Sequence, residues 1–304
     1  MPFYLAPMAE LSHRALRELI EGFGGCDGYF TEMISASALL AGGPFEKWYI
    51  DTAPRPEKCV FQLVGSDSES ISAAAAVLDK LECGGIDINM GCSAPLIRKN
   101  GAGAAWMASI DRAGELISRV RPVVKRRLSV KLRLGFKEDF EYLARFCRRL
   151  EEEGVELITL HPRLVTEKFK RLARWEYVVK LKEELKIPVA GNGDIDSAQG
   201  LVRRAKQCDA VMAGRAAVKM PWIFAQAREK TWTSCGLMET GLRFLELLSM
   251  YQSPEFHVSR ARRFFSYFCD NLKWGTFIKN QINREETLCG IEKAWIEGMK
   301  SDQV

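Results

Sequence analysis

The chain is poor in the side chains that usually hold metals. It has only three histidines, and no two of its nine cysteines form a Cys-x-x-Cys pair. These absences argue against a zinc ribbon or a cysteine-held iron–sulfur cluster, so we expect no metal site. An odd number of scattered cysteines also favours a reducing compartment over a disulfide framework.

Long apolar runs are absent as well. No uninterrupted run approaches membrane-spanning length, and the first residues, MPFYLAPMAE, have neither a basic leader nor a long apolar segment. We therefore expect a cytoplasmic protein without a signal peptide and without a membrane partner. No pattern indicates an oligomer, and a monomer is expected.

The composition is that of a globular protein with a real core. Of the 304 residues, 47% are hydrophobic and 27% are charged, and the formal net charge is +5. This length allows one large domain, or one large domain with a small one. The mild positive charge permits a polyanionic partner without requiring one.

Short apolar runs alternate with helical spacers over most of the chain. They lie at 3–7, 28–33, 59–64, 85–90, 128–134, 157–160, 187–190 and 210–213. Such alternation predicts parallel strands joined by right-handed helical crossovers. Eight units in this length favour a (β/α)8 TIM barrel over an open doubly wound sheet. No GxGxxG follows the first strand, which disfavours a Rossmann dinucleotide site.

Two helix boundaries are predicted from local signals. Ser12 is expected to cap a helix that runs to Glu21, and a helix opened by Ser109 and Asp111 is expected to reach about Arg126. From about Thr233 the pattern changes to amphipathic helices without a strand signal. We therefore expect a barrel domain at 1–232 and a small C-terminal α-helical domain at 233–304.

A polar or otherwise special residue stands at nearly every predicted strand exit. These residues are Met8, Glu32, Gln62, Asn89 with Cys92, Lys131, His161 with Arg163, Asn192 with Asp194, and Gly214 with Arg215. Active sites of TIM barrels lie at the carboxyl ends of the strands. Polar residues also mark where strands stop, but Gln62 and Lys131 lie inside apolar runs, where an unpaired polar group is costly.

Cys92 follows a buried strand on a turn between Gly91 and Pro95, so its thiol is placed to meet a ligand. The alternative is simple packing, since free cysteine is among the most buried residue types. Lys131 would form a Schiff base or stabilise an electron-rich ring. His161 is either a hydrogen-bonded structural residue or a ligand contact.

Glycine-containing turns follow the last two predicted strands, at 191–194 and at Gly214-Arg215. Loops at these two positions of a barrel commonly hold a phosphate, and Arg215 adds positive charge. The turns therefore predict a phosphate-bearing ligand with a flat body over the barrel mouth, although turns also use glycine for purely local reasons.

An ordered set of segments resembles the tRNA-dihydrouridine synthases. It runs from about Leu5 to Phe224 and comprises YLAPMAE, TEM, FQLVGSD, DINMGC, GAGAAWM, VKLRLGF, LHPR, PVAGNGDI and VMAGRAAVKMPWIF. The resemblance implies an FMN-dependent barrel that reduces the C5=C6 bond of selected uridines in tRNA. It also implies NADPH as the reductant and a C-terminal domain that binds RNA.

The resemblance also implies roles for individual residues. Cys92 would be the acid that protonates C5, and Asn89 and Arg163 would face the uracil. The residues around the isoalloxazine would be Pro7, Met8, Gln62, Lys131 and His161. The residues that hold the ribityl chain and phosphate would be Asn192, Gly193, Asp194, Gly214 and Arg215.

Two positions depart from the family pattern. Ser93 follows Cys92 where the family usually has proline, and Arg171 stands where the family tends to have glycine. Other readings therefore stay open: a different RNA such as ribosomal RNA, a free small molecule of the dihydroorotate or enoate type, or an inactive RNA-binding homologue.

Basic clusters occur at 125–127, 168–171, 203–206 and 260–263. They are consistent with an RNA partner or with solvated helix faces. The last cluster is followed by Phe264 and Phe265, which belong either to an RNA-contacting helix or to the core.

Overall fold

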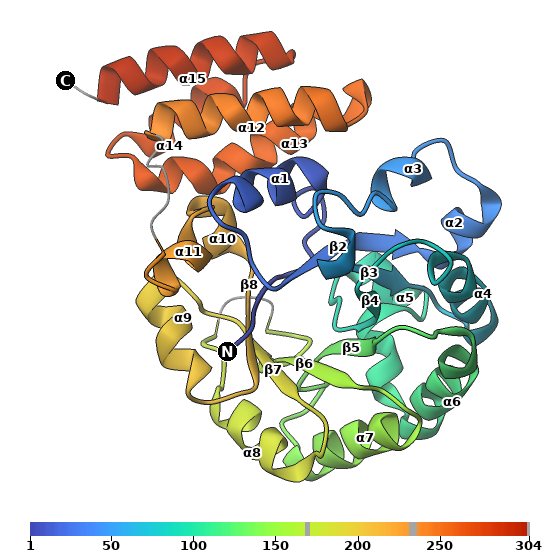
Figure 1. Ribbon diagram of the computed structural model, residues 1–304. Helices are drawn as coiled ribbons and strands as arrows, with labels where there is room; N and C mark the ends of the chain where they lie inside the picture. Colours follow the sequence, from blue (N-terminus) through green and yellow to red (C-terminus); the bar gives the residue numbers. More distant parts are fainter. Residues whose placement is uncertain (168–170, 231–235, 303–304) are drawn as a thin grey trace.

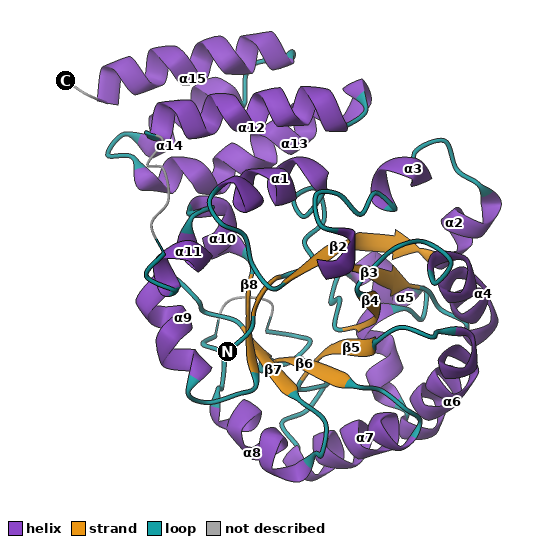
Figure 2. Cartoon of the chain, in the orientation of Figure 1, coloured by secondary structure: helices purple, strands orange, loops and turns teal. Residues whose placement is uncertain are grey.

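A computed structural model describes residues 1–167, 171–230 and 236–302 of the chain. Its parallel strands form a closed barrel in chain order, with the first strand paired to the last (Figures 1 and 2). The strands are β1 (Phe3–Leu5), β2 (Gly28–Ser35), β3 (Cys59–Val64), β4 (Gly85–Met90), β5 (Leu128–Arg133), β6 (Leu157–His161), β7 (Val189–Asn192) and β8 (Ala210–Ala213). The predicted (β/α)8 barrel is confirmed.

Helices surround the strands as an outer ring (Figure 2). They are α1 (Arg14–Gly22), α4 (Ser68–Leu78), α6 (Ile110–Val120), α7 (Phe140–Glu152), α8 (Glu176–Glu184), α9 (Ala198–Ala205), α10 (Arg215–Lys219) and α11 (Ile223–Ala227). Shorter helices lie in the loops: α2 (Ala36–Ala41), α3 (Glu46–Tyr49) and α5 (Pro95–Lys99). Side-chain caps begin several helices of the outer ring. At the start of α4, for example, Asp67 accepts from the Ser70 N–H at 2.7 Å.

Ser109 caps α6 as predicted, but the cap of the first helix and the end of α6 are corrected. Helix α1 begins at Arg14, because Ser12 uses its hydroxyl to accept from the Met8 N–H at 2.9 Å instead of capping the helix. Helix α6 ends at Val120 and is followed by a 3-10 turn, Arg121–Val123. Pro122 explains this end, since proline has no N–H and its ring clashes with the preceding helical turn.

The barrel interior is apolar near the amino ends of the strands and polar near their carboxyl ends. Alternation along the strands points residues such as Val60 and Gln62 to the same inner side. A buried cluster that includes Tyr4, Phe30 and Val60 lies near the amino ends of the strands. The inner positions nearer the carboxyl ends carry polar side chains, so the fold places its chemistry at one mouth of the barrel.

Four longer helices follow the barrel and pack over α1 and α10 (Figure 1). They are α12 (Leu237–Tyr251), α13 (Pro254–Phe268), α14 (Gly275–Ile282) and α15 (Leu288–Asp302). Phe264 stacks on Phe244 at a centroid distance of 3.7 Å, and Phe265 contacts Trp295 at 4.8 Å. Both phenylalanines therefore belong to the core.

The expected boundary between residues 232 and 233 lies outside the described residues. The division into two domains stays a prediction. Within the described ranges, no helix is both long and apolar enough to cross a membrane.

A buried ion pair joins β2 to α13. Arg260 Nη2 lies 3.0 Å from Glu32 Oε2, and the two side chains are only 2% and 4% exposed. Glu32 also accepts from the Glu10 N–H at 2.6 Å, and the Arg260 guanidinium lies 4.6 Å from the centre of the Phe256 ring. The polar residue at the second strand exit thus anchors the C-terminal helices to the barrel.

Candidate active site

A cavity of about 450 Å³ opens at the carboxyl ends of the strands. Every site residue predicted from the sequence lines it: Pro7, Met8, Gln62, Asn89, Cys92, Lys131, His161, Arg163, Asn192, Gly193, Asp194, Gly214 and Arg215. Its size suits a cofactor or a small ligand. Residues from all parts of the barrel are therefore brought together, while the role of each one stays a prediction.

The turn that carries Cys92 is held from three sides. Asn89 Oδ1 accepts from the Gly91 N–H at 3.1 Å and from the Cys92 N–H at 2.9 Å. Arg133 Nε donates to the Gly91 carbonyl at 3.0 Å, and the Ala104 N–H donates to the Cys92 carbonyl at 3.0 Å. These contacts fix the backbone on both sides of the thiol, so Ser93 in place of proline does not leave the turn unsupported.

Below this turn lies a continuous buried chain of polar side chains. Asn89 Nδ2 donates to Gln62 Oε1 at 2.8 Å, and Gln62 Nε2 donates to Asp87 Oδ2 at 2.7 Å. The Ser129 hydroxyl donates to the other oxygen of Asp87 at 2.6 Å. Each of these side chains is at most 7% exposed. Gln62 and Asn89 thus each have hydrogen-bond partners within the protein at both the oxygen and the nitrogen of the amide.

Two charged groups beside the cavity have displaced pKa values. Burial, reinforced by Arg133, lowers the pKa of Lys131 to about 8, and the Asp87 carboxylate opposes this shift. Burial raises the pKa of Asp87 to about 6, against the hydrogen bonds from Ser129 and Gln62. At neutral pH both groups are mainly charged, so the ammonium of Lys131 lines the cavity and the carboxylate of Asp87 is buried outside it.

His161 is neutral. Burial lowers its pKa well below the ordinary value, and Lys131, Arg133, Arg163 and Arg215 add to the effect. Its Nε2 lies 3.0 Å from Arg163 Nη1. Arginine can only donate, so Nε2 is the acceptor and the proton of the ring is on Nδ1.

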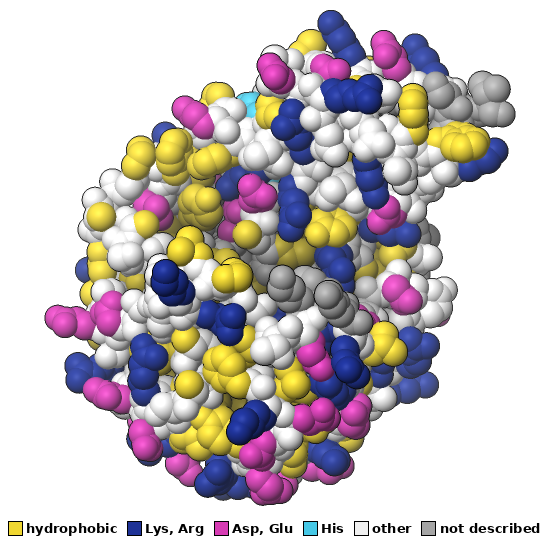
Figure 3. Space-filling view, turned by 180° about the vertical axis from the view of Figure 1, so that it is seen from behind, with side chains coloured by type: hydrophobic (Ala, Val, Ile, Leu, Met, Phe, Trp, Pro, Cys, Tyr) yellow, Lys and Arg dark blue, Asp and Glu magenta, His cyan; other side chains and the backbone are white. Residues whose placement is uncertain are grey.

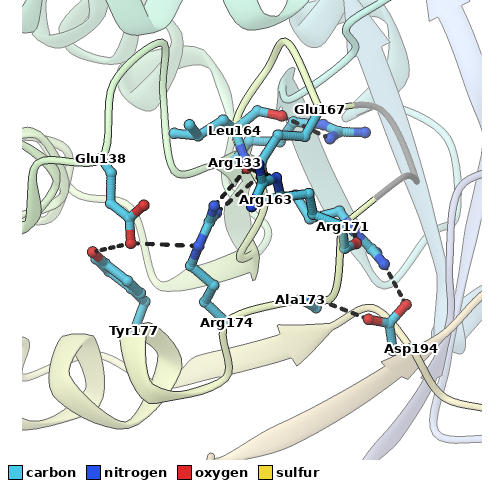
Figure 4. Close-up of polar contacts among 10 residues, drawn as sticks. All are labelled: Arg133, Glu138, Arg163, Leu164, Glu167, Arg171, Ala173, Arg174, Tyr177 and Asp194. Carbon is cyan, nitrogen blue, oxygen red and sulfur yellow. Dashed lines mark hydrogen bonds and ion pairs between the residues drawn. The ribbon is translucent and has the colours of Figure 1, made fainter.

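Arg163 braces the loop that follows β6 (Figure 4). Its Nη2 contacts Asp194 Oδ1 at 2.5 Å, and its Nε donates to the Arg171 carbonyl at 2.5 Å. The other oxygen of Asp194 accepts from the Ala173 N–H at 2.7 Å. Arg163 is 2% exposed, so its described contacts tie it to the protein, and contact with a substrate stays a prediction.

The same loop is attached to the loop after β5. Glu167 accepts from Arg174 at 2.5 and 3.0 Å, and Arg174 lies 3.4 Å from Glu138 (Figure 4). Tyr177 donates to Glu138 at 2.9 Å. Arg171 extends outward with a 75% exposed side chain, so a large residue is tolerated there without disturbing the cavity.

Glycine keeps two walls of the cavity clear. At Gly193, where φ is +117°, a Cβ atom would lie 2.8 Å from His161 Cδ2. At Gly214 it would lie 3.3 Å from Met8 Sδ. Lys131, Arg133 and Arg215 add positive charge around the space. The lining therefore fits a flat ligand with an anionic end.

Arg133 and Arg263 line the cavity but were not predicted as site residues. Arg133 lies in the strand segment VKLRLGF, where its position two residues after Lys131 was an available signal. Arg263 comes from α13, and only the packing of that helix over the barrel brings it to the mouth. No local pattern marks it.

The basic clusters do not form one surface. Residues 125–127 directly precede β5 and residues 203–206 precede β8, and none of them lines the cavity. In the cluster at 168–171 only Arg171 is described. Lys and Arg side chains gather where the C-terminal helices meet the barrel (Figure 3). In the cluster at 260–263, Arg260 is buried and Arg263 lines the cavity.

Among the side chains placed by the structure, no group of three or more His, Cys, Asp or Glu residues could hold a metal ion.

A closed parallel barrel with helices outside it and a polar cavity at the carboxyl ends of its strands defines the class of TIM-barrel proteins. A solved structure of a variant of NCR from Zymomonas mobilis shares this fold, with a TM-score of 0.53, 15% identity, and 84% of this chain and 92% of that chain covered. Residues 4–292 match the model of the dihydrouridine synthase (Dus) family, and the chain belongs to that family.

Named relatives agree with this assignment. A probable tRNA-dihydrouridine synthase of Aquifex aeolicus is 36% identical over 261 residues, which are 83% of this chain and 81% of that protein. The corresponding protein of Rhodobacter capsulatus is 32% identical over 74% of this chain and 70% of its own length. The tRNA-dihydrouridine(16) synthase of Neisseria meningitidis is 29% identical, with 74% and 70% covered.

Proposed function

We propose that the protein reduces uridine to 5,6-dihydrouridine in tRNA, with FMN as cofactor and NADPH as electron donor. The observation that carries the proposal is the meeting of Cys92, Lys131 and His161 at one cavity in a member of this family. Relatives whose names specify tRNA support the choice of substrate. We also propose that the enzyme acts as a cytoplasmic monomer.

The side chains around the cavity divide the work by their chemistry. Lys131 and neutral His161 would lie against the flavin ring, together with Pro7, Met8 and Gln62. The ribityl chain and phosphate would be held by Asn192, Gly193, Asp194, Gly214 and Arg215. Positive charge on Lys131 would stabilise the electron-rich reduced ring.

When bound and reduced, FMN would supply a hydride to C6 of the uracil. Cys92 would donate its Sγ proton to C5, and the thiolate would then take a proton from solvent. The anchored turn holds the Sγ in one place, and Asn89 and Arg163 would orient the base. Because a pyrimidine inside a duplex is out of reach, the target uridine has to be unstacked or single-stranded.

Purified protein should carry oxidised flavin, bleach with NADPH, and recover its colour when unmodified tRNA is added. Cys92→Ala should retain FMN and reduce uridine at least about a hundredfold more slowly, because the general acid is lost. The checks are the flavin spectrum and dihydrouridine content by mass spectrometry. Protein that cannot be reconstituted with FMN, or unchanged turnover in Cys92→Ala, would overturn the proposal.

The same assay distinguishes the other readings. Re-oxidation by free uracil or orotate, but not by tRNA, would indicate a small-molecule enzyme. Re-oxidation by ribosomal RNA alone would change the substrate and keep the chemistry. Binding of tRNA without turnover would indicate an inactive homologue.

A further inference from the structure

Asp87 is fully buried on β4 below Gln62 and is not among the residues that line the cavity. A buried carboxylate is costly unless hydrogen bonds and opposite charges compensate for the loss of water. The shift of its pKa to about 6 reflects the same cost. The groups that Asp87 contacts must therefore account for a carboxylate at this position.

The hydrogen bonds of the chain above Asp87 run in one direction only. Two backbone N–H groups, of Gly91 and Cys92, donate to Asn89, so this end of the amide must be the oxygen. Its nitrogen therefore faces Gln62, which must present Oε1. The nitrogen of Gln62 then points at Asp87, and only an acceptor can satisfy it. A carboxylate meets this requirement.

We infer that Asp87 is a positioning residue: it fixes the direction of the Gln62 and Asn89 amides and thereby holds the turn that presents Cys92. The role of the thiol belongs to the proposed function, but the effect of Asp87 on the turn does not depend on that function. Asp87 acts through two side chains and touches neither substrate nor cofactor.

The donor-to-acceptor direction of these side-chain hydrogen bonds can be reversed by substitution. Asn89→Asp still accepts from both backbone N–H groups but cannot donate to Gln62. Gln62 would then have to turn its nitrogen upward and its oxygen toward the Asp87 carboxylate, which repels it. In Asp87→Asn with Asn89→Asp, the new amide at position 87 can donate to the turned Gln62 and accept from Ser129. The double variant restores a complete chain that runs in the opposite direction.

The single change Asp87→Asn should be mild. Its oxygen can accept from Gln62 while its nitrogen donates to Ser129, whose hydroxyl can rotate to accept. Asp87→Ala offers no acceptor and should release the turn. Thr159→Val is the matched control, because Thr159 is equally buried on β6 and its hydroxyl has no hydrogen-bond partner in the structure.

The primary measurement is the alkylation rate of Cys92 in protein without added cofactor or RNA, followed by peptide mass spectrometry. Cys289, an exposed free thiol on α15, is the internal reference. In Asn89→Asp and Asp87→Ala we expect alkylation of Cys92 about tenfold faster, because the released turn exposes the thiol more often. Asp87→Asn, Thr159→Val and the double variant should stay within about threefold of the original chain.

Uridine reduction should fall by about tenfold to a hundredfold in Asp87→Ala, which releases the turn without changing a residue that lines the cavity. Additive effects in the double variant, or an unchanged alkylation rate in Asn89→Asp, would overturn the inference. If Asp87→Ala does not fold, the comparison of Asn89→Asp with the double variant still tests the inference, because both keep side chains of the original size. The alkylation results stand even if the protein proves to have another substrate.

Discussion

At the scale of single residues, the cavity keeps two basic side chains in different protonation states. His161 is buried among cations and stays neutral, whereas Lys131 has a pKa of about 8 and the nearby carboxylate of Asp87 favours its charged form. If the Lys131 ammonium stabilises reduced flavin, loss of its proton should slow the reaction.

We therefore expect uridine reduction to decline above about pH 8. Lys131→Arg keeps its charge at that pH, so its rate should be lower throughout but should lack this decline. Asp87→Asn removes a negative charge that raises the pKa of Lys131, so the decline should begin at lower pH. Single-turnover rates of flavin re-oxidation by tRNA from pH 6 to about pH 10 test this range. An identical alkaline decline in Lys131→Arg would assign it to another group.

At the scale of elements, the strands could be predicted closely from the sequence. Cys59–Val64, Gly85–Met90 and Ala210–Ala213 lie within the expected runs, because buried parallel strands leave short apolar segments. Helix ends were predicted less well: Ser12 is used by the Met8 backbone, and Pro122 stops α6 early.

The candidate site shows the same limit. Residues that follow strands, such as Cys92 and His161, could be predicted because the barrel brings strand ends together. Arg263 could not be predicted, because its place at the cavity depends on how α13 docks. Likewise, no local pattern around Glu32 indicates that its ion-pair partner, Arg260, lies on that helix.

We expect the docking of α13 to depend on the ion pair between Glu32 and Arg260. Arg260→Met should leave a buried carboxylate unpaired and lower the free energy of unfolding by about 3 to 5 kcal/mol. Arg243→Met is the control, because its pair with Glu246 is exposed and should contribute less than about 1 kcal/mol. Urea unfolding at neutral pH measures both. Equal losses in the two variants would show that the buried pair does not anchor the helix.

At the scale of the whole molecule, stability should depend on a histidine between the barrel and the C-terminal helices. His13 is 1% exposed, and its ring centre lies 6.1 Å from that of Phe244 on α12. Burial, with Arg260 and Arg17 nearby, lowers its pKa well below the ordinary value. The folded protein therefore keeps this ring neutral under conditions in which an unfolded chain would protonate it.

Below about pH 6.5 the unfolded chain binds a proton that the folded chain cannot bind at His13, so stability falls as the pH falls. One such group contributes up to about 1.4 kcal/mol per pH unit. His13→Phe should flatten the decline between pH 6.5 and about pH 5, as measured by urea unfolding at several pH values. A slope equal to that of the original chain would rule out this source.

Gly103 lies outside the cavity, yet it constrains the reactive turn. Its φ is +59°, and a Cβ there would lie 2.8 Å from the Cys92 carbonyl oxygen and 3.0 Å from the Cys92 Cβ. A side chain at 103 would thus push on the cysteine from behind. A homologue that keeps every polar group of the pocket but carries a larger residue in place of this glycine is therefore expected to have lost its activity.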